Sequence, residues 1–331
     1  MIENIRVSIG SAAVLGLKAI EFPVSTTTCY IMTFKEGHCI ANCGFCPQAR
    51  EAKSSVEKLS RISWPMFSFK DFITKLKYMP PQKRFKRICI QTLNYKENFK
   101  DLIEIITQIK SISNIPISIA IPPMSKEKLK EFYLIGVQRV GIALDGASSE
   151  IFEKIKGKGV NGPYNWDRHM ECIKNALEIF PEGLVTTHII VGLGETEKEI
   201  TNLIKKLKNL KVLSSLFAFT PIKGTKLENY LQPKLTKFRK MQLVRHLILE
   251  ENRDIKDFAF NHDGILVNIN ISRKKLKEII DLTDAFLTSG CPGCNRPYYT
   301  SRPSGPIYNY PRKLNEKEKA EVYRSLEFFV K

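Results

Sequence analysis

The chain has 331 residues, of which 43% are hydrophobic and 26% charged, a balance typical of one large globular α/β domain or two small ones. Eight cysteines are too few for a disulfide scaffold, and neither a signal peptide nor a bilayer-length apolar run is visible, so we expect a cytoplasmic protein. The net charge of +18 comes from dispersed lysines, which indicates solvated surfaces first and an acidic protein partner second.

The predicted elements alternate between strand and helix along most of the chain. An apolar stretch at 7–22 predicts a helix or a hairpin, and the β-branched run 25–33 predicts a first strand. Apolar runs then predict strands at 87–92, 115–121, 140–144, 184–191 and 213–220. Helical spacing of apolar residues predicts helices at 67–78, 99–111, 125–135, 167–180, 196–210 and 238–251.

About six strand–helix units of this kind predict an α/β fold with a parallel sheet, curled by right-handed crossovers into a partial or full (β/α) barrel. The pattern changes near residue 255. Short strands at 258–260 and 265–271, helices at 274–288 and 316–330, and a loop-rich tail follow. We therefore expect an N-terminal extension (1–24), a barrel (25–254) and a C-terminal extension (255–331).

Three cysteines follow the first predicted strand. Cys39, Cys43 and Cys46 have the spacing C-x3-C-x2-C. Three thiolates on one loop can hold three corners of a [4Fe–4S] cube and leave the fourth iron open to a small molecule. A zinc knuckle is the alternative, with His38 or Cys29 as fourth ligand.

With Phe45 directly before the last cysteine, this motif resembles the radical S-adenosylmethionine (SAM) superfamily. The resemblance implies that SAM chelates the open iron and that its reductive cleavage releases a 5′-deoxyadenosyl radical. It also implies the barrel type predicted above. Cys39, Cys43 and Cys46 would then be the catalytic residues.

The order of motifs after Cys46 resembles biotin-synthase-type members over residues 30–250. The stretch from His188 to Glu195 is similar to G-x-I-x-G-x-x-E, with His188 in place of the first glycine. A carboxylate at the end of the fourth strand would bind the SAM ribose. The resemblance implies a SAM site made of Phe45, Asp145, Ile190, Gly192, Glu195 and Gly224.

Biotin synthase itself is a poor match, because its second cluster is held by cysteines on barrel strands. Cys89 matches one of these positions, but Ser118 and Thr186 stand near the other two. We therefore expect Cys89, like Cys172 on its helix, to be a small buried hydrophobic residue.

The C-terminal stretch Cys291-Pro-Gly-Cys-Asn-Arg-Pro-Tyr-Tyr resembles the archaeal and anaerobe "biotin synthase-related" proteins that act as a two-protein lipoyl synthase. The resemblance implies an auxiliary [4Fe–4S] cluster as sulfur source. Cys291 and Cys294 would supply two ligands and Cys29 the third, with Ser301 or Ser304 closing the fourth corner. A zinc site is the alternative, with Cys29 and one of the five histidines completing it.

The implied activity is sulfur insertion into an unactivated C–H bond of a protein-bound octanoyl group. The implied partners are an octanoylated acidic carrier domain, such as a lipoyl domain or an H-protein-like domain, a second synthase protein and a ferredoxin-like electron donor. No membrane and no nucleic acid are expected. The alternatives are thiolation of another substrate (a dethiobiotin-like acid or tRNA) and a non-catalytic iron–sulfur or zinc scaffold that binds nucleic acid.

Overall fold

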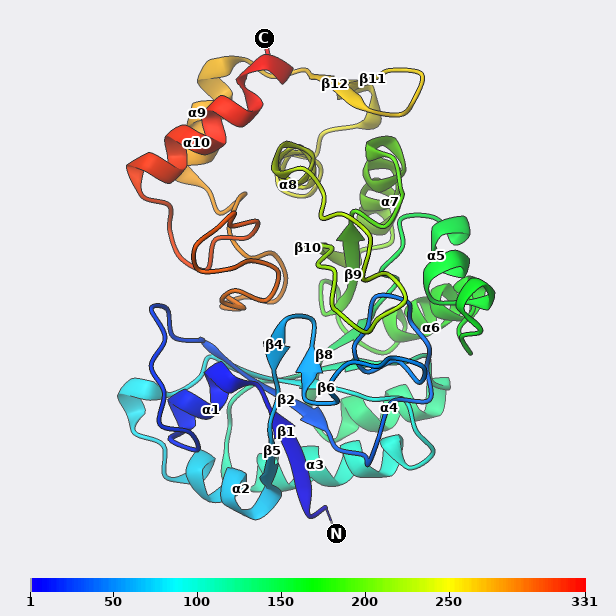
Figure 1. Ribbon diagram of the computed structural model, residues 1–331, viewed down its shortest axis with the longest axis vertical. Helices are drawn as coiled ribbons and strands as arrows, with labels where there is room; N and C mark the ends of the chain where they lie inside the picture. Colours follow the sequence, from blue (N-terminus) through cyan, green and yellow to red (C-terminus); the bar gives the residue numbers. More distant parts are fainter. Residues whose placement is uncertain (1) are drawn as a thin grey trace.

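Six parallel strands form the centre of the protein, whose computed structural model describes residues 2–331 (Figure 1). In spatial order they are β10 (Leu213–Ala218), β9 (Val185–Val191), β8 (Val137–Ile142), β7 (Ile117–Ile121), β6 (Arg87–Gln91) and β2 (Thr28–Thr33). All five neighbouring pairs are parallel. The predicted parallel α/β fold, a partial barrel, is therefore confirmed.

Helices connect these strands and cover the outer face of the sheet. They are α2 (Phe69–Lys77), α3 (Asn98–Ile112), α4 (Lys126–Leu134), α6 (Trp166–Leu177), α7 (Glu197–Asn209) and α8 (Leu235–Leu249). In α3 the buried side chains Leu102, Ile105, Ile106 and Ile109 recur at helical spacing, so one apolar stripe faces the sheet. No helix among residues 2–331 is long and apolar enough to cross a membrane.

The N-terminal segment extends the sheet through a strand that was not predicted, and the helix expected within 7–22 is short. β1 (Asn4–Val7) pairs antiparallel with β2, and β5 (Met66–Ser68) pairs antiparallel with β1. The helix α1 (Ile9–Leu15) follows β1 and ends at Gly16, whose φ of 69° suits glycine. The sequence signal was ambiguous because β1 has its partners elsewhere in the chain.

Smaller elements complete the barrel region. A hairpin of β3 (Lys58–Leu59) and β4 (Ile62–Ser63) follows the cysteine loop. A helix that the sequence did not predict, α5 (Ser149–Ile155), precedes α6. Short 3₁₀ helices span Pro81–Lys83, Lys158–Val160, Ile255–Asp257 and Glu327–Phe329.

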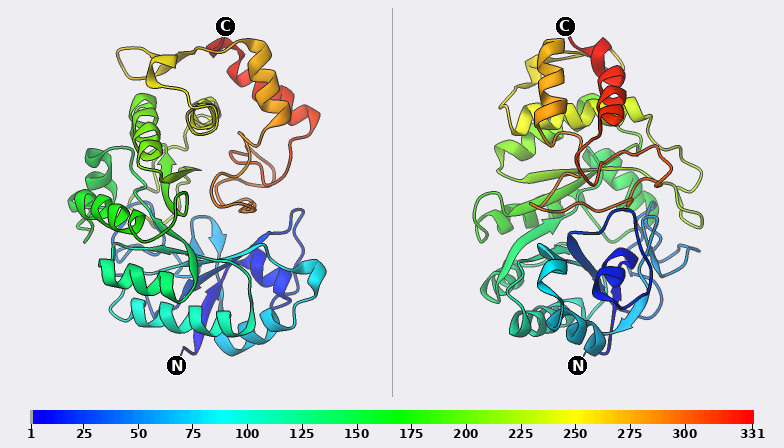
Figure 2. Two further views of the ribbon diagram at one scale, coloured as in Figure 1. Left: turned by 180° about the vertical axis from the view of Figure 1, so that it is seen from behind. Right: turned by 90° about the vertical axis from the view of Figure 1, so that its left-hand side faces the viewer.

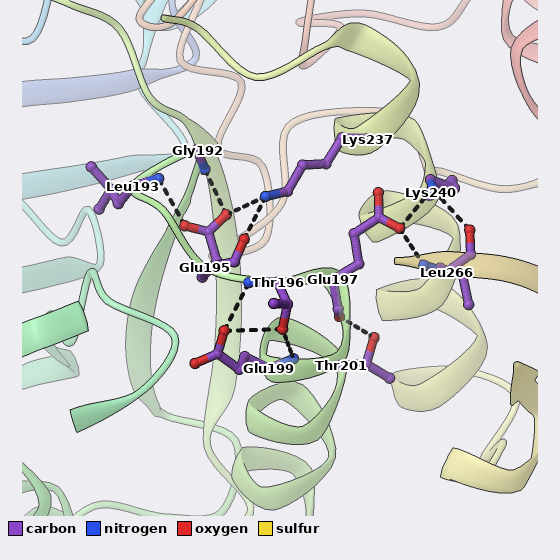
Figure 3. Close-up of polar contacts among 10 residues, drawn as sticks. All are labelled: Gly192, Leu193, Glu195, Thr196, Glu197, Glu199, Thr201, Lys237, Lys240 and Leu266. Carbon is purple, nitrogen blue, oxygen red and sulfur yellow. Dashed lines mark hydrogen bonds and ion pairs between the residues drawn. The ribbon is translucent and has the colours of Figure 1, made fainter. Parts of the chain in front are cut away.

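The C-terminal region packs on the barrel through a buried ion pair. The hairpin of β11 (Phe258–Phe260) and β12 (Leu266–Ile269) lies beside α7 and α8. The Lys240 ammonium lies 2.6 Å from the Glu197 carboxylate, and both groups are almost fully buried. The same carboxylate accepts the backbone N–H of Leu266 at 2.6 Å, which joins the hairpin to the two helices (Figure 3).

Residues 283–315, called the tail below, run between α9 (Arg273–Leu282) and α10 (Glu316–Leu326). The tail lies between the two halves of the molecule (Figures 1 and 2). The Ser289 hydroxyl accepts the N–H of Leu216 in β10 at 2.8 Å. The side-chain Oδ1 of Asn295 accepts the N–H of Thr27 at 3.0 Å. The tail therefore spans the gap between β10 and the start of β2.

Candidate active site

A cavity of about 310 Å³ is enclosed between the partial barrel and the tail. Its walls come from the sheet, the loop after β2, the β3–β4 hairpin and the tail. Six of the eight cysteines border it, namely Cys39, Cys43, Cys46, Cys89, Cys291 and Cys294. None of the eight is in a disulfide. The structure thus brings two sets of thiols, far apart in the sequence, to one chamber.

The first set is held by the backbone of its own loop. The Sγ of Cys39 accepts N–H bonds from Ala41 at 3.4 Å and from Asn94 at 3.1 Å. Cys46 donates its N–H to the Cys43 carbonyl at 3.0 Å, which closes a tight turn between the last two cysteines. Amide N–H groups pointing at sulfur favour its thiolate form.

Burial controls the protonation of these thiols. It raises the pKa of Cys43 to about 12 and raises the pKa values of Cys39 and Cys46 as well. The nearby ammonium of Lys156 acts in the opposite direction on the pKa of Cys39 and Cys43. In the free protein the thiols are protonated, so a metal that binds them must displace protons.

The second set combines one strand cysteine with two tail cysteines. Gln91 donates to the Sγ of Cys89 at 3.1 Å, and the Tyr30 hydroxyl lies 3.0 Å from the Sγ of Cys294. Burial raises the pKa of Cys89, and the neighbouring sulfurs of Cys291 and Cys294 raise it further. The sulfurs of Cys291 and Cys294 therefore lie close enough to Cys89 to influence its pKa.

Arg296 is the cation of this second set. Its guanidinium lowers the pKa of Cys89 and Cys294, against the larger effect of burial. The guanidinium lies 3.9 Å from the ring centroid of Phe217. The backbone N–H of Arg296 donates to the Tyr30 hydroxyl at 3.1 Å. Lys156 beside the first set and Arg296 beside the second therefore both favour thiolate, with further contributions from Lys35 at Cys39 and Arg87 at Cys294.

The placement of Cys29 and Cys89 corrects our prediction. Successive side chains of a strand face opposite sides of a sheet. Tyr30 lines the cavity, so Cys29 faces the helices, where it is fully buried in the apolar core. In β6, Cys89 is the residue opposite Tyr30, and its side chain faces the cavity as that of Tyr30 does. Cys89, and not Cys29, accompanies Cys291 and Cys294, while Cys172 is buried in the core as predicted.

The predicted closing hydroxyl is also corrected. Ser301 accepts the N–H of Tyr308 at 2.9 Å and does not border the cavity, and Ser304 is exposed and does not border it either. Ser118, opposite Cys89 in the register of β6 and β7, instead has its hydroxyl 3.7 Å from the Sγ of Cys291. The tail thus places the thiol of Cys291 next to the hydroxyl of Ser118 in β7.

Three of the residues predicted to contact SAM line the cavity: Phe45, Asp145 and Ile190. Asp145 has a φ of 62° and its Oδ2 lies 2.8 Å from the ammonium of Lys156. Both side chains are nearly buried. The carboxylate is therefore held at the cavity wall by a cation that the sequence analysis did not single out.

The other three predicted residues shape the walls from outside the cavity. Both oxygens of Glu195 accept N–H bonds of its own turn, from Gly192 at 2.8 Å and from Leu193 at 2.7 Å, and Lys237 pairs with it at 2.9 Å (Figure 3). At Gly224 a Cβ atom would lie 2.7 Å from the backbone of Lys53, and φ is +86°. These residues position loops and do not border the cavity.

The two thiol sets suit clusters better than single ions. Among residues 2–331, no three His, Cys, Asp or Glu side chains converge as ligands of one metal ion do. Iron–sulfur clusters are held by cysteines that bind different irons, so their sulfurs need not converge on one point. Three thiols per set, cations near each set and amide donors to the sulfurs of Cys39 and Cys89 fit such a group.

Two histidines that line the cavity, His169 and His188, were not predicted as SAM-site residues. Burial lowers the pKa of His169 to about 3 and the pKa of His188 to about 4, and both rings are neutral at pH 7. In the sequence analysis His188 was a departure from a glycine motif, and both histidines were candidate ligands only of the alternative zinc site. Lys156 and Arg296 had no sequence signal, because nothing local marks a lysine or arginine that becomes buried beside thiols.

Comparisons with known proteins agree with this geometry. The family described as "Radical SAM superfamily" matches residues 37–207. Biotin synthase of Campylobacter hominis is 31% identical over 212 residues, which cover 61% of this chain and 59% of that protein. Biotin synthase of Methanococcus aeolicus is 29% identical over 201 residues, covering 60% and 57%. The matched region is therefore less than two thirds of these relatives' length.

Solved structures support the fold. The FeFe-hydrogenase maturase HydG from Carboxydothermus hydrogenoformans superposes with a TM-score of 0.53 at 17% identity, covering 88% of this chain and 65% of that one. Another crystal structure of HydG gives a TM-score of 0.51 at 13% identity, covering 64% and 48%. At such identities the likeness concerns architecture alone.

Proposed function

The chain belongs to the radical SAM superfamily, and from this premise we propose that it inserts sulfur into an unactivated C–H bond of a protein-bound octanoyl group, as a component of a lipoyl synthase. One observation carries the proposal: two sets of three thiols line the same cavity. A substrate carbon in that cavity could meet both a radical source and a sulfur source without leaving it.

In this proposal Cys39, Cys43 and Cys46 hold a [4Fe–4S] cluster that binds SAM. When bound, the cluster and SAM supply the one-electron chemistry that removes a hydrogen atom from a methylene group. The protein's part is to hold the three sulfurs in place on one loop, while Lys156 favours the thiolate forms of Cys39 and Cys43 and two backbone amides favour that of Cys39. Asp145, held at the cavity wall by Lys156, is the carboxylate that would bind the ribose diol of SAM.

Cys89, Cys291 and Cys294 are proposed to hold a second iron–sulfur cluster, whose sulfide is the sulfur source. Arg296 favours the thiolate forms of Cys89 and Cys294, and the Tyr30 hydroxyl lies within hydrogen-bond distance of the Cys294 sulfur. In terms of domains, residues 25–254 would form the catalytic barrel, and residues 255–331 would complete the second site. The barrel strand contributes the remaining ligand, so neither part alone would hold that cluster.

An apolar wall supports an acyl substrate. The rings of Tyr30 and Tyr299 lie 5.3 Å apart between centroids, and Trp64 meets Tyr299 edge-on at 6.2 Å. Leu93 and Phe217 continue this lining. A hydrocarbon chain binds such a surface by displacing water, which also protects reactive intermediates.

The likeness to biotin synthases favours a second candidate, thiolation of a small dethiobiotin-like acid. The experiment that separates the candidates is anaerobic. The reconstituted protein is reduced in the presence of SAM and offered an octanoylated carrier domain with the second synthase protein, or dethiobiotin, or tRNA. Mass spectrometry of each substrate and counting of 5′-deoxyadenosine follow.

Sulfur in the octanoyl group supports the proposal, and sulfur only in dethiobiotin or tRNA moves the assignment to that substrate. Absence of 5′-deoxyadenosine under all conditions would favour a non-catalytic metal scaffold. Cys172→Ala is a suitable matched control, because its thiol is buried in the core and borders neither cysteine set.

A further inference from the structure

A second depression, of about 460 Å³, lies beside the cavity and is lined by four cationic side chains. We call it the basic vestibule and define it by Lys58, Arg61, Lys223 and Arg302. Its other lining residues are neutral, among them Thr220, Gln232, Thr300 and Ser301. No Asp or Glu side chain is among the residues that line it.

The basic vestibule shares walls with the cavity. Thr220 and Thr300 border both spaces. In the β3–β4 hairpin, Leu59 and Ser60 border the cavity, whereas their neighbours Lys58 and Arg61 border the vestibule. A group that occupies the vestibule is therefore separated from the cavity by a single layer of chain.

The hairpin and the tail are tied together along this wall. The Ser60 hydroxyl donates to the carbonyl of Tyr299 at 2.9 Å, and the Arg61 guanidinium donates to the carbonyl of Ser301. The two segments thus present their cations from a joined surface and not from independent loops.

Within residues 2–331, none of the four vestibule cations is in an ion pair with a carboxylate. Partial burial lowers the pKa of Arg61, and nearby Arg302 lowers it further, so like charges lie close together. Close like charges are unfavourable, and an anionic partner would relieve the repulsion.

We propose that the basic vestibule docks the acidic surface of the octanoylated carrier domain beside the acyl-lysine, so that the acyl chain enters the adjoining cavity. This inference rests on the proposed function. The distribution of apolar and charged side chains supports it. The aromatic wall of the cavity suits the acyl chain, whereas the four cations of the basic vestibule lie outside the cavity, where the body of a carrier would rest.

The test uses charge reversal at two exposed vestibule residues, Lys58→Glu with Arg302→Glu. Neither side chain makes a hydrogen bond that folding would lose within the described chain. The matched control reverses one arginine and one lysine at the exposed start of α9, Arg273→Glu with Lys274→Glu. This end of α9 lies far from the tail, near the C-terminus (Figure 1).

Affinity for an octanoylated carrier domain is measured at low and at physiological ionic strength. We expect the vestibule variant to bind about tenfold more weakly at low salt, with a flatter salt dependence, and the control variant to bind like wild type. Thiolation of a short octanoyl-lysine peptide, which lacks an acidic surface, should be unchanged in both.

The outcomes separate this inference from the proposed function. Equal carrier affinity in wild type and vestibule variant would overturn the docking site while leaving sulfur insertion intact. Intact carrier binding with loss of reduction by an acidic electron-donor protein would assign the vestibule to that donor and also overturn the inference. If wild type neither binds the carrier nor thiolates the peptide, the proposed function fails, and the docking site fails with it.

Discussion

Replacing Cys89 by alanine should remove one iron–sulfur cluster while leaving SAM cleavage intact. Cys89 faces the cavity together with Cys291 and Cys294. The other cysteines that line the cavity are the three of the first loop. Two remaining thiols would not retain a cube. The matched change is Cys29→Ala, one residue before Tyr30 on the paired strand, with its sulfur turned toward the core.

The expected magnitude follows from this count of ligands. A protein with two [4Fe–4S] clusters carries about eight irons per chain, so Cys89→Ala should carry about four. Cys29→Ala should keep about eight, because it deletes only one buried sulfur from the apolar core, at a cost of about 1 kcal/mol in the free energy of unfolding.

Anaerobic reconstitution followed by iron and acid-labile sulfide analysis measures this difference, and electron paramagnetic resonance of the reduced samples identifies the remaining cluster. Formation of 5′-deoxyadenosine reports separately on the first site. If Cys89→Ala keeps eight irons, or if Cys29→Ala loses four, then Cys89 is not the ligand of the second cluster that its position on the cavity face of the sheet indicates.

Three further predictions concern the first site, acidity and stability. Cys43→Ala should abolish 5′-deoxyadenosine formation, and full SAM cleavage by this variant would exclude the loop as the radical site. His169 is buried and its folded pKa is near 3, below its ordinary 6.5, so only the unfolded chain takes up its proton as pH falls. When the pH is lowered from 6.5 to 5, the stability lost in urea unfolding should therefore be about 2 kcal/mol smaller in His169→Phe than in wild type, while buried His188 contributes a similar loss to both proteins. Glu197→Gln should destabilise the fold by about 3 kcal/mol because it leaves the buried ammonium of Lys240 without a counter-charge, whereas Glu182→Gln at an exposed pair should cost under about 1 kcal/mol, and equal melting shifts would contradict this.

The fold could be predicted where the signal is local. The parallel strands and their helices follow from apolar runs and helical spacing, as in α3 with its buried stripe. β1 was missed because its pairing with β2 and β5 depends on residues far along the chain. The seven-residue α5 was missed because so short a helix shows little periodicity.

The site could be predicted only in part for related reasons. Cys39, Cys43 and Cys46 lie on one loop, so their spacing alone places them together. Cys29 was preferred to Cys89 because it lies near the first cysteine loop and because the neighbouring barrel strands lack cysteines that would accompany Cys89. The sequence could not correct this choice, since every residue of β2 is buried and no alternation of polar and apolar residues reveals which face is inside. The tail decides the matter, since it carries Cys291 and Cys294 to the side that Cys89 faces.

The cations of the site were beyond sequence reasoning for a different reason. Lys156 reaches Asp145 from a turn after α5, and Arg296 reaches the second thiols from the tail. In the sequence they are two among 52 lysines and arginines. Only their burial beside sulfur and carboxylate distinguishes them.

The most direct test of sulfur insertion from a second cluster uses isotopically labelled sulfide. The protein is reconstituted with iron and heavy sulfide, freed of unbound sulfide, and allowed a single turnover with SAM, reductant, the second synthase protein and an octanoylated carrier domain. We predict that the thiolated octanoyl group carries the heavy isotope in wild type and that Cys89→Ala forms no such product. A thiolated product without the label, or the same labelled product from Cys89→Ala, would contradict the assignment of Cys89, Cys291 and Cys294 as ligands of the sulfur source.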